Sequence, residues 1–243
     1  MDIRIYDSPA EMAEKTAWSV ASLIRQNPGR LICFAAGDTP LGMLRELIRL
    51  QEKGCCDLRS MYYAGLDEWI GLGYGDKGSC AQVMKDTFYT PAGIPPEHMC
   101  IFDGLARDTD AECRKMEGWI KARGGLFLTV LGVGMNGHIG FNEPFAPDRE
   151  GCFTIALDAT TRAVSEKYFG KSLPVTAGIT IGWRTLLTAE RMFVLASGKN
   201  KASIIEQAFA GEPSSAVSAS RTQEHGSLVV ALDKEAAARL KNS

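Results

Sequence analysis

The chain has 243 residues, of which 45% are apolar and 23% charged, and its formal net charge at pH 7 is −2. These values are typical of a globular protein with a sizeable core, and the small net charge argues against nucleic acid or an anionic membrane as a partner. No apolar run is long enough to span a bilayer, and the first residues do not resemble a secretion signal. The seven cysteines include no C-x-x-C pair. We therefore expect a cytoplasmic protein with reduced thiols.

Predicted strands and helices alternate through the first half of the chain. Ser8-Pro9-Ala10-Glu11 is a capping box with proline at the first helical position, so a helix is predicted to run from there to about Arg25. Apolar runs predict strands at residues 3–6, 30–36, 60–66 and 99–102, and helices are predicted at residues 41–50, 79–88 and 108–123.

The apolar run at residues 126–131 is predicted to be a strand buried on both faces. The glycine-rich loop after it contains Gly132, Gly134 and Gly137, which match the dinucleotide-binding pattern G-x-G-x-x-G. That pattern requires a helix at its last glycine, whereas residues 138–144 have no helical periodicity and end in proline. We therefore expect no nicotinamide cofactor.

The second half of the chain continues the alternation. Strands are predicted at residues 153–157, 191–196 and 228–232, and helical segments at residues 158–169, 183–187, 202–209 and 234–241. No internal repeat or long linker divides the chain. We therefore predict a single α/β domain, residues 1–243, with a doubly wound, mostly parallel sheet covered by helices on both faces, a Rossmann-like arrangement.

Four polar clusters directly follow predicted strands. They are Gly37-Asp38-Thr39, Asp67-Glu68, the loop from Gly132 to Glu143, and the segment from Gly198 to Lys201. In a parallel sheet all four would lie at the same carboxyl edge. Each cluster alone is a weak signal, since the first could be an ordinary turn and the second a helix cap. Together they offer an anion site, carboxylates, an imidazole and a cation, which suits proton transfer on a small phosphorylated molecule.

His138 is the most informative of these residues because it lies in a glycine-rich loop. Glu143 is close enough in sequence to hydrogen-bond the imidazole and to favour its charged form. A lone histidine is more often structural, and Lys201 and Arg162 could each be only a solvated charge. The absence of H-E-x-x-H, of Cys/His ligand spacing and of G-x-S-x-G argues against a metal site and against a serine hydrolase.

The segment from Gly134 to Pro144, Gly-Met-Asn-Gly-His-Ile-Gly-Phe-Asn-Glu-Pro, resembles the hallmark of the glucosamine-6-phosphate deaminase/isomerase family. Further matches fall in the same order along most of the chain: Gly37-Asp38-Thr39-Pro40, Leu66-Asp67-Glu68-Trp69, Asp110-Ala111-Glu112-Cys113, Thr161-Arg162, Pro174-Val175-Thr176, and Gly198 to Ala202.

The resemblance implies a role for each candidate residue. His138 would assist opening of the sugar ring, with Glu143 holding it and Asn136 beside it, and Asp67 would move a proton between the second and first carbons through an enolamine. The amino group would then leave as ammonia. Glycines of the loop (Gly132, Gly134, Gly137), Glu68, the turn Gly37-Asp38-Thr39, Arg162 and Lys201 would contact the substrate or its phosphate. The implied classes are isomerase, deaminase and hydrolase in amino-sugar catabolism, without cofactor, with a homo-oligomer possible.

Two departures from the family pattern are present. Asn136 stands where many members have aspartate, and Asp38 stands where glycine or serine is usual. The alternatives to a glucosamine 6-phosphate substrate are its galacto epimer, a 6-phosphogluconolactonase activity, and a sugar-phosphate sensor that does not turn over. The Phe-Asn-Glu-Pro ending, which contains Glu143, argues against the lactonase.

Overall fold

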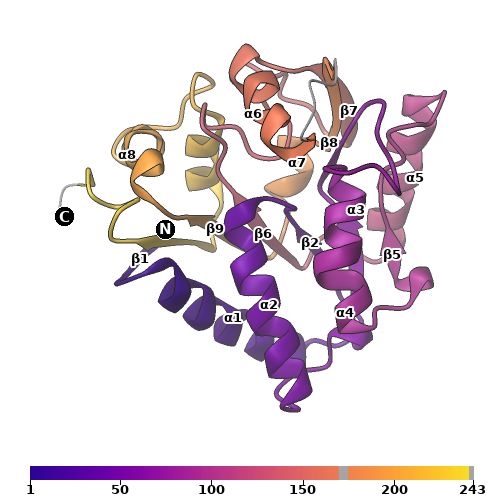
Figure 1. The fold of residues 1–243 in the computed structure, drawn as a ribbon, viewed down its shortest axis with the longest axis horizontal. Helices are drawn as coiled ribbons and strands as arrows, with labels where there is room; N and C mark the ends of the chain where they lie inside the picture. The colour runs from indigo at the N-terminus through magenta and orange to yellow at the C-terminus, as the bar shows by residue number, and fades with distance from the viewer. Residues whose placement is uncertain (170–174, 241–243) are drawn as a thin grey trace.

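The computed structural model describes residues 1–169 and 175–240 (Figure 1). Its main sheet has seven strands in the order β1-β10-β9-β6-β2-β3-β5, and every neighbouring pair is parallel. The strands are β1 (Asp2–Tyr6), β2 (Leu31–Phe34), β3 (Tyr62–Gly65), β5 (Met99–Cys100), β6 (Leu128–Gly132), β9 (Arg191–Ala196) and β10 (Leu228–Asp233). The predicted parallel α/β sheet is confirmed.

Helices cover both faces of this sheet. On one face lie α1 (Pro9–Gln26), α2 (Asp38–Glu52), α3 (Cys80–Met84), the π-helical turn η2 (Lys85–Tyr89) and α4 (Thr90–Ala92), and on the other lie α5 (Thr109–Ala122), α7 (Trp183–Leu186) and α8 (Ala202–Phe209). Alternate residues of each strand supply the two cores. In β2, Ile32 and Phe34 pack toward α1 and α2, while Leu31 and Cys33 pack toward α5. A strand with two buried faces has to be apolar throughout, as β2 is.

A second, three-stranded antiparallel sheet was not predicted. It has the order β4-β8-β7, formed by β4 (Asp67–Trp69), β8 (Ala177–Ile181) and β7 (Cys152–Ala156). Helix α6 (Ala159–Phe169) follows β7, and Figure 1 shows it beside this small sheet. Gly178 makes the packing possible, because a Cβ there would lie 2.3 Å from the Phe141 ring. The small sheet places β4, and with it Asp67, beyond the carboxyl end of β3.

The short 3-10 segments are η1 (Leu58–Ser60), η3 (Pro96–His98), η4 (Lys199–Lys201) and η5 (Ser218–Glu224). The helix predicted at residues 234–241 is wrong for the described residues 234–240, which form turns. Their backbone bonds mix spacings, with Ala237 N–H donating to Asp233 and Leu240 N–H to Ala237, so no regular helical ladder develops. Residue 241 and Pro174 lie outside the described residues.

None of the helices in the described part of the chain combines the length and the hydropathy needed to traverse a lipid bilayer.

Candidate active site

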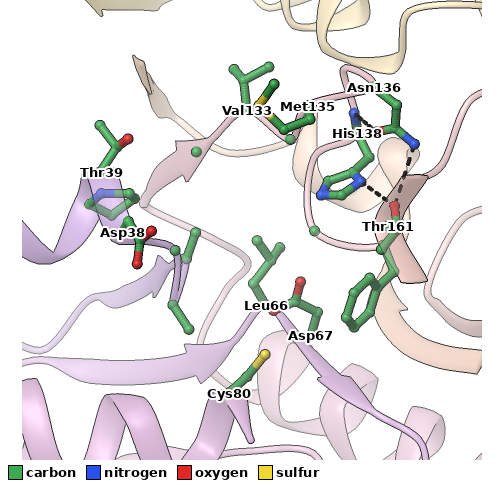
Figure 2. Close-up of a pocket in the computed structure, with 18 of the residues that line it drawn as sticks. Asp38, Thr39, Leu66, Asp67, Cys80, Val133, Met135, Asn136, His138 and Thr161 are labelled. Carbon is green, nitrogen blue, oxygen red and sulfur yellow. Dashed lines mark hydrogen bonds between the residues drawn. The ribbon is translucent and has the colours of Figure 1, made fainter. Parts of the chain in front are cut away.

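Strands β9, β6, β2 and β3 are consecutive neighbours in the sheet, and their carboxyl ends surround a cavity of about 570 Å³. Of the predicted site residues, those that line it are Gly37, Asp38, Thr39, Asp67, Gly132, Gly134, Asn136, His138 and Lys201. Figure 2 shows His138 and Asp67 on different walls of this one cavity. The geometry therefore brings together the four polar clusters that follow the predicted strands.

The imidazole of His138 is held from behind. Its Nδ1 lies 3.0 Å from Oγ1 of Thr161 and 3.4 Å from Oε2 of Glu143. The backbone of Gly134 packs against the other side of the ring, because a Cβ at that position would lie 2.3 Å from Nε2. In Figure 2 the second ring nitrogen faces the cavity. With Nδ1 occupied by these partners, Nε2 is the atom that can exchange a proton with a ligand.

Asn136 is the centre of the polar network behind His138. Its Nδ2 donates to Oε2 of Glu143 at 2.8 Å, and its Oδ1 accepts from the backbone N–H of His138 at 3.1 Å. The same Nδ2 lies 3.3 Å from Oδ1 of Asp158 and 3.4 Å from Oγ1 of Thr161. An aspartate at 136 could not donate to two carboxylates, so the asparagine fits this arrangement.

Glu143 lies behind the cavity wall, as a residue that holds His138 should. Its side chain is buried, and burial acts to raise its pKa, but the bonds and charge of His138 together with the donors Thr161 and Asn136 outweigh burial and lower the pKa. The carboxylate is therefore ionised at neutral pH.

Two members of this network, Thr161 and Asp158, were not predicted as site residues. Thr161 was noted only within the family-like pair with Arg162, and Asp158 only as the first residue of the helical segment predicted at residues 158–169. Asp158 immediately precedes α6. Its Oδ1 accepts from Thr160 N–H at 2.8 Å, and its own N–H donates to Glu143 at 3.3 Å. An aspartate at the start of a predicted helix is an N-cap signal that could have drawn attention to this position.

Asp67 is the first residue of β4 and lines the cavity. Burial and the neighbouring carboxylate of Glu68 raise its pKa to about 7, against the opposing effect of a hydrogen bond from Cys80. A cavity-facing carboxyl group with a pKa near neutrality is suited to general base catalysis.

The prediction that Glu68 contacts the substrate is not supported by this geometry. Glu68 is fully buried and does not line the cavity. Its carboxylate accepts from the N–H groups of Trp69, Cys80 and Ala81 and from the hydroxyl of Ser79. Successive side chains of a strand point to opposite faces, so Glu68 must face the protein interior when Asp67, the residue before it in β4, faces the cavity.

The far end of the cavity has the features of an anion site. Gly37 is the N-cap of α2, and Asp38 and Thr39 of its first turn line the cavity. Thr39 Oγ1 lies 3.5 Å from Oγ of Ser197, and Nζ of Lys201 donates to the carbonyl of Val133 at 2.6 Å. A helix N-terminus and a lysine that line the same cavity are an arrangement that can bind phosphate.

Gly137 and Arg162 do not line the cavity. Gly137 has a φ of 85°, and a Cβ there would lie 2.9 Å from Val217, so this glycine shapes the loop rather than the cavity wall. Arg162 follows Thr161 on α6 with an exposed side chain. Its contact with a phosphate stays a prediction. Lining residues that were not named as site residues include Cys80 and Ser197, and also Trp69, Phe141 and Asn200, which lie within the quoted motifs or predicted clusters.

Comparison with known proteins gives consistent results. The profile of the family "Glucosamine-6-phosphate isomerases/6-phosphogluconolactonase" matches residues 7–230. The chain is 36% identical over 243 residues to a glucosamine-6-phosphate deaminase of Halothermothrix orenii, covering 99% of this chain and 100% of that one. It is 35% identical over 229 residues to a glucosamine-6-phosphate deaminase of Bacillus velezensis, covering 93% of this chain and 95% of that one.

Solved structures agree. A protein described as a monomeric glucosamine-6-phosphate deaminase superposes with a TM-score of 0.93 at 32% identity, covering 98% of this chain and 99% of that chain. A 6-phosphogluconolactonase of Thermotoga maritima superposes with a TM-score of 0.77 at 18% identity, covering 96% and 99%, a likeness that shows the fold alone. The chain belongs to the glucosamine-6-phosphate isomerase/6-phosphogluconolactonase family.

Proposed function

We propose that this protein is a glucosamine-6-phosphate deaminase, which converts glucosamine 6-phosphate and water to fructose 6-phosphate and ammonia. The observation that carries the proposal is that one cavity is lined by Asp67, by His138 and by the α2 N-terminus with Lys201. These are a base, a proton donor and an anion site. The names of relatives that are about a third identical over nearly their whole length support the same substrate.

The phosphate is the group that fixes the substrate in the cavity. We place it at the first turn of α2, between Thr39 and Lys201, where the helix dipole and the ammonium group both favour an anion. Arg162, one residue after the cavity-lining Thr161, is proposed to add a second cation. The sugar carbons then extend toward His138 and Asp67.

His138 opens the sugar ring. Its Nε2 gives a proton to the ring oxygen while the C1 hydroxyl gives its proton to water, so that the C1–O5 bond breaks and the open-chain aldehyde forms. Glu143, which its low pKa keeps ionised, holds the ring from behind with Oε2 at 3.4 Å from Nδ1.

Asp67 then carries out the isomerisation. Its carboxylate removes the C2 proton while the aldehyde oxygen takes a proton from water, giving an enolamine, and it then returns a proton to C1, giving an iminium at C2. Water adds to C2, the C2–N bond breaks, and ammonia leaves with the proton it needs. One water is consumed, so the reaction is formally an isomerisation followed by a hydrolysis. Proton transfer by a positioned group contributes on the order of a hundred- to ten-thousand-fold in rate.

The test is ammonia release from glucosamine 6-phosphate, with galactosamine 6-phosphate and 6-phosphogluconolactone in parallel. We expect release from the gluco sugar and little lactone hydrolysis. A preference for the galacto epimer would reassign the sugar, and lactone hydrolysis without ammonia release would replace the proposed reaction. In Asp67→Asn, we expect loss of solvent proton exchange at C2 with substrate binding retained. Undiminished exchange would remove Asp67 from the role of base.

The proposal includes two further points, a cytoplasmic location and a homo-oligomeric state. The seven cysteines are all free thiols, which suits a reducing compartment. A similar protein is described as monomeric. Light scattering of the purified protein decides between a monomer and an oligomer.

A further inference from the structure

One polar group in the cavity wall has no part in the mechanism above, the thiol of Cys80. Cys80 is the first residue of α3, its side chain is half-buried, and it lines the cavity. The same cavity wall carries Asp67, whose charge acts on the thiol and helps to raise its pKa. In Figure 2 the sulfur points from α3 toward Asp67 on β4. The thiol is therefore directed at the proposed base and not only at the cavity.

The backbone around Cys80 is fixed by the buried Glu68 carboxylate. Oε1 of Glu68 accepts from Cys80 N–H at 3.0 Å, and Oε2 accepts from Ala81 N–H at 2.8 Å and from Ser79 Oγ at 2.7 Å. Ser79 is also the N-cap of α3, through a bond from Gln82 N–H. Glu68 follows Asp67 directly in β4, so the residue next to the base holds the helix start that carries the thiol.

We propose that Cys80 is a positioning residue for the base: its S–H donates to one oxygen of Asp67 and leaves the other oxygen directed at the substrate, with Glu68 fixing the helix start that aims the thiol. The proposal rests on the proposed function, because it assigns Asp67 as the base. It gives Glu68 a role as an anchor of this geometry in place of a substrate contact.

The charges around Asp67 are consistent with this role. The titratable groups that face it are Glu68 on β4, Cys80 on α3 and Cys33 on β2, with His138 across the cavity. Burial, and next the charge of Asp67, raise the pKa of the Cys80 thiol well above its usual range, so the thiol keeps its proton and can donate. Donation to the charged form lowers the pKa of Asp67, whereas burial and Glu68 raise it.

The experiment compares Cys80→Ala, Cys80→Ser and the surface control Cys55→Ala by the pH profile of kcat/KM for ammonia release. Loss of a hydrogen bond of about 0.5–1.5 kcal/mol raises the pKa of Asp67 by about 0.4–1 unit. The acidic limb of the kcat/KM profile of Cys80→Ala should therefore shift to higher pH by that amount. Below the limb its kcat/KM should fall about three- to tenfold, with little change above pH 8.5. Cys80→Ser, which keeps a donor, and Cys55→Ala should retain the wild-type limb.

A loss in Cys80→Ala that is equal at every pH would mean that the thiol only fills the wall, and failure of serine to restore the limb would rule out donation. Either result overturns the proposal. A second measurement gives the pKa of Asp67 in the same variants without substrate. It follows the carboxylate band by infrared spectroscopy as the pH is changed, with Asp67→Asn as the difference reference. Wild-type protein that releases no ammonia, while this titration moves up in Cys80→Ala, would refute the proposed function and leave the contact established.

Discussion

Asp67 occupies a position where its charged form is disfavoured, and this has a consequence for stability. Its pKa is raised to about 7 in the folded protein by burial and by Glu68, from an ordinary value of 3.8. Between these two values the folded state binds more protons than the unfolded state, so the free energy of unfolding falls as the pH rises through this window.

We therefore expect Asp67→Asn to be more stable than the wild type at pH 8, by on the order of 1 kcal/mol or more, and to differ little at pH 4. For a chain of this size that corresponds to about 2–4 °C in Tm per kcal/mol. Calorimetric scans at the two pH values measure it. An equal change at both pH values, or a loss at pH 8, would contradict a raised pKa at Asp67.

Thr161 has a role in holding His138 that can be separated from its role in packing. Its hydroxyl lies 3.0 Å from Nδ1 of His138 in a buried position. Thr161→Val keeps the shape and removes the hydrogen bond, so we expect kcat/KM for ammonia release to fall about three- to tenfold, the equivalent of one ordinary hydrogen bond. Thr161→Ser keeps the hydroxyl and should remain near the wild type. A valine variant with full activity would show that Glu143 alone orients the ring.

The residues that sequence reasoning found and missed differ in a physical way. His138 and Asp67 could be predicted because each follows a strand in a recognisable local motif. Thr161 and Cys80 could not, because each touches its catalytic partner from an element 23 and 13 residues away, respectively, and nothing in the local pattern of either segment encodes that contact. Glu68 was predicted to contact the substrate, and its buried position could not be foreseen for the same reason: its four donors belong to Trp69 and to the distant start of α3.

At the scale of elements, the buried strands of the parallel sheet were predicted well because apolar runs with two buried faces are long and unambiguous. The small sheet was missed because β4 has only three residues and its pairing with β8 joins Asp67 to Thr180 across more than a hundred positions. Short strands of this kind are defined by their partners rather than by their own pattern.

The turn between β9 and α8 is the element that carries the proposed phosphate cation. Both carboxylate oxygens of the buried Asp233, at the end of β10, accept from Gly198 N–H at 3.0 and 3.1 Å, and Gly198 has a φ of 89°. This anchor sets the path of the chain through η4, so that Lys201 lines the cavity while Lys199, two residues earlier, is exposed and does not.

The two lysines therefore form a matched pair for an element-scale prediction. A hydrogen bond to a charged group is worth about 1.5–3 kcal/mol, so Lys201→Ala should raise KM for the sugar phosphate about ten- to a hundredfold with kcat changed much less. Lys199→Ala should leave both values unchanged. Steady-state kinetics of ammonia release measures both variants. An effect of Lys201→Ala confined to kcat would contradict a phosphate role.

At the scale of the whole molecule, the cavity depends on the order of the sheet. Strands β9, β6, β2 and β3 are neighbours in the sheet. In the sequence their order is β2, β3, β6 and β9, and the segments that connect each strand to the next have between 27 and 62 residues. A ligand that contacts the loops after all four strands binds only when the sheet is formed, and it therefore stabilises the folded chain by mass action.

We expect fructose 6-phosphate, the proposed product, to raise Tm because it would contact both the anion site and the wall with Asp67. At a concentration one hundred times its Kd the stabilisation is about 2.7 kcal/mol, or about 5–10 °C for a domain of this size. Fructose without the phosphate should give a much smaller shift at the same concentration, and Lys201→Ala should reduce the shift given by the phosphate ester. Differential scanning fluorimetry over a concentration series measures all three.

Equal shifts from the sugar and its phosphate would show that the α2 N-terminus and Lys201 do not form the anion site. No shift from either compound would mean that the cavity does not bind the proposed product.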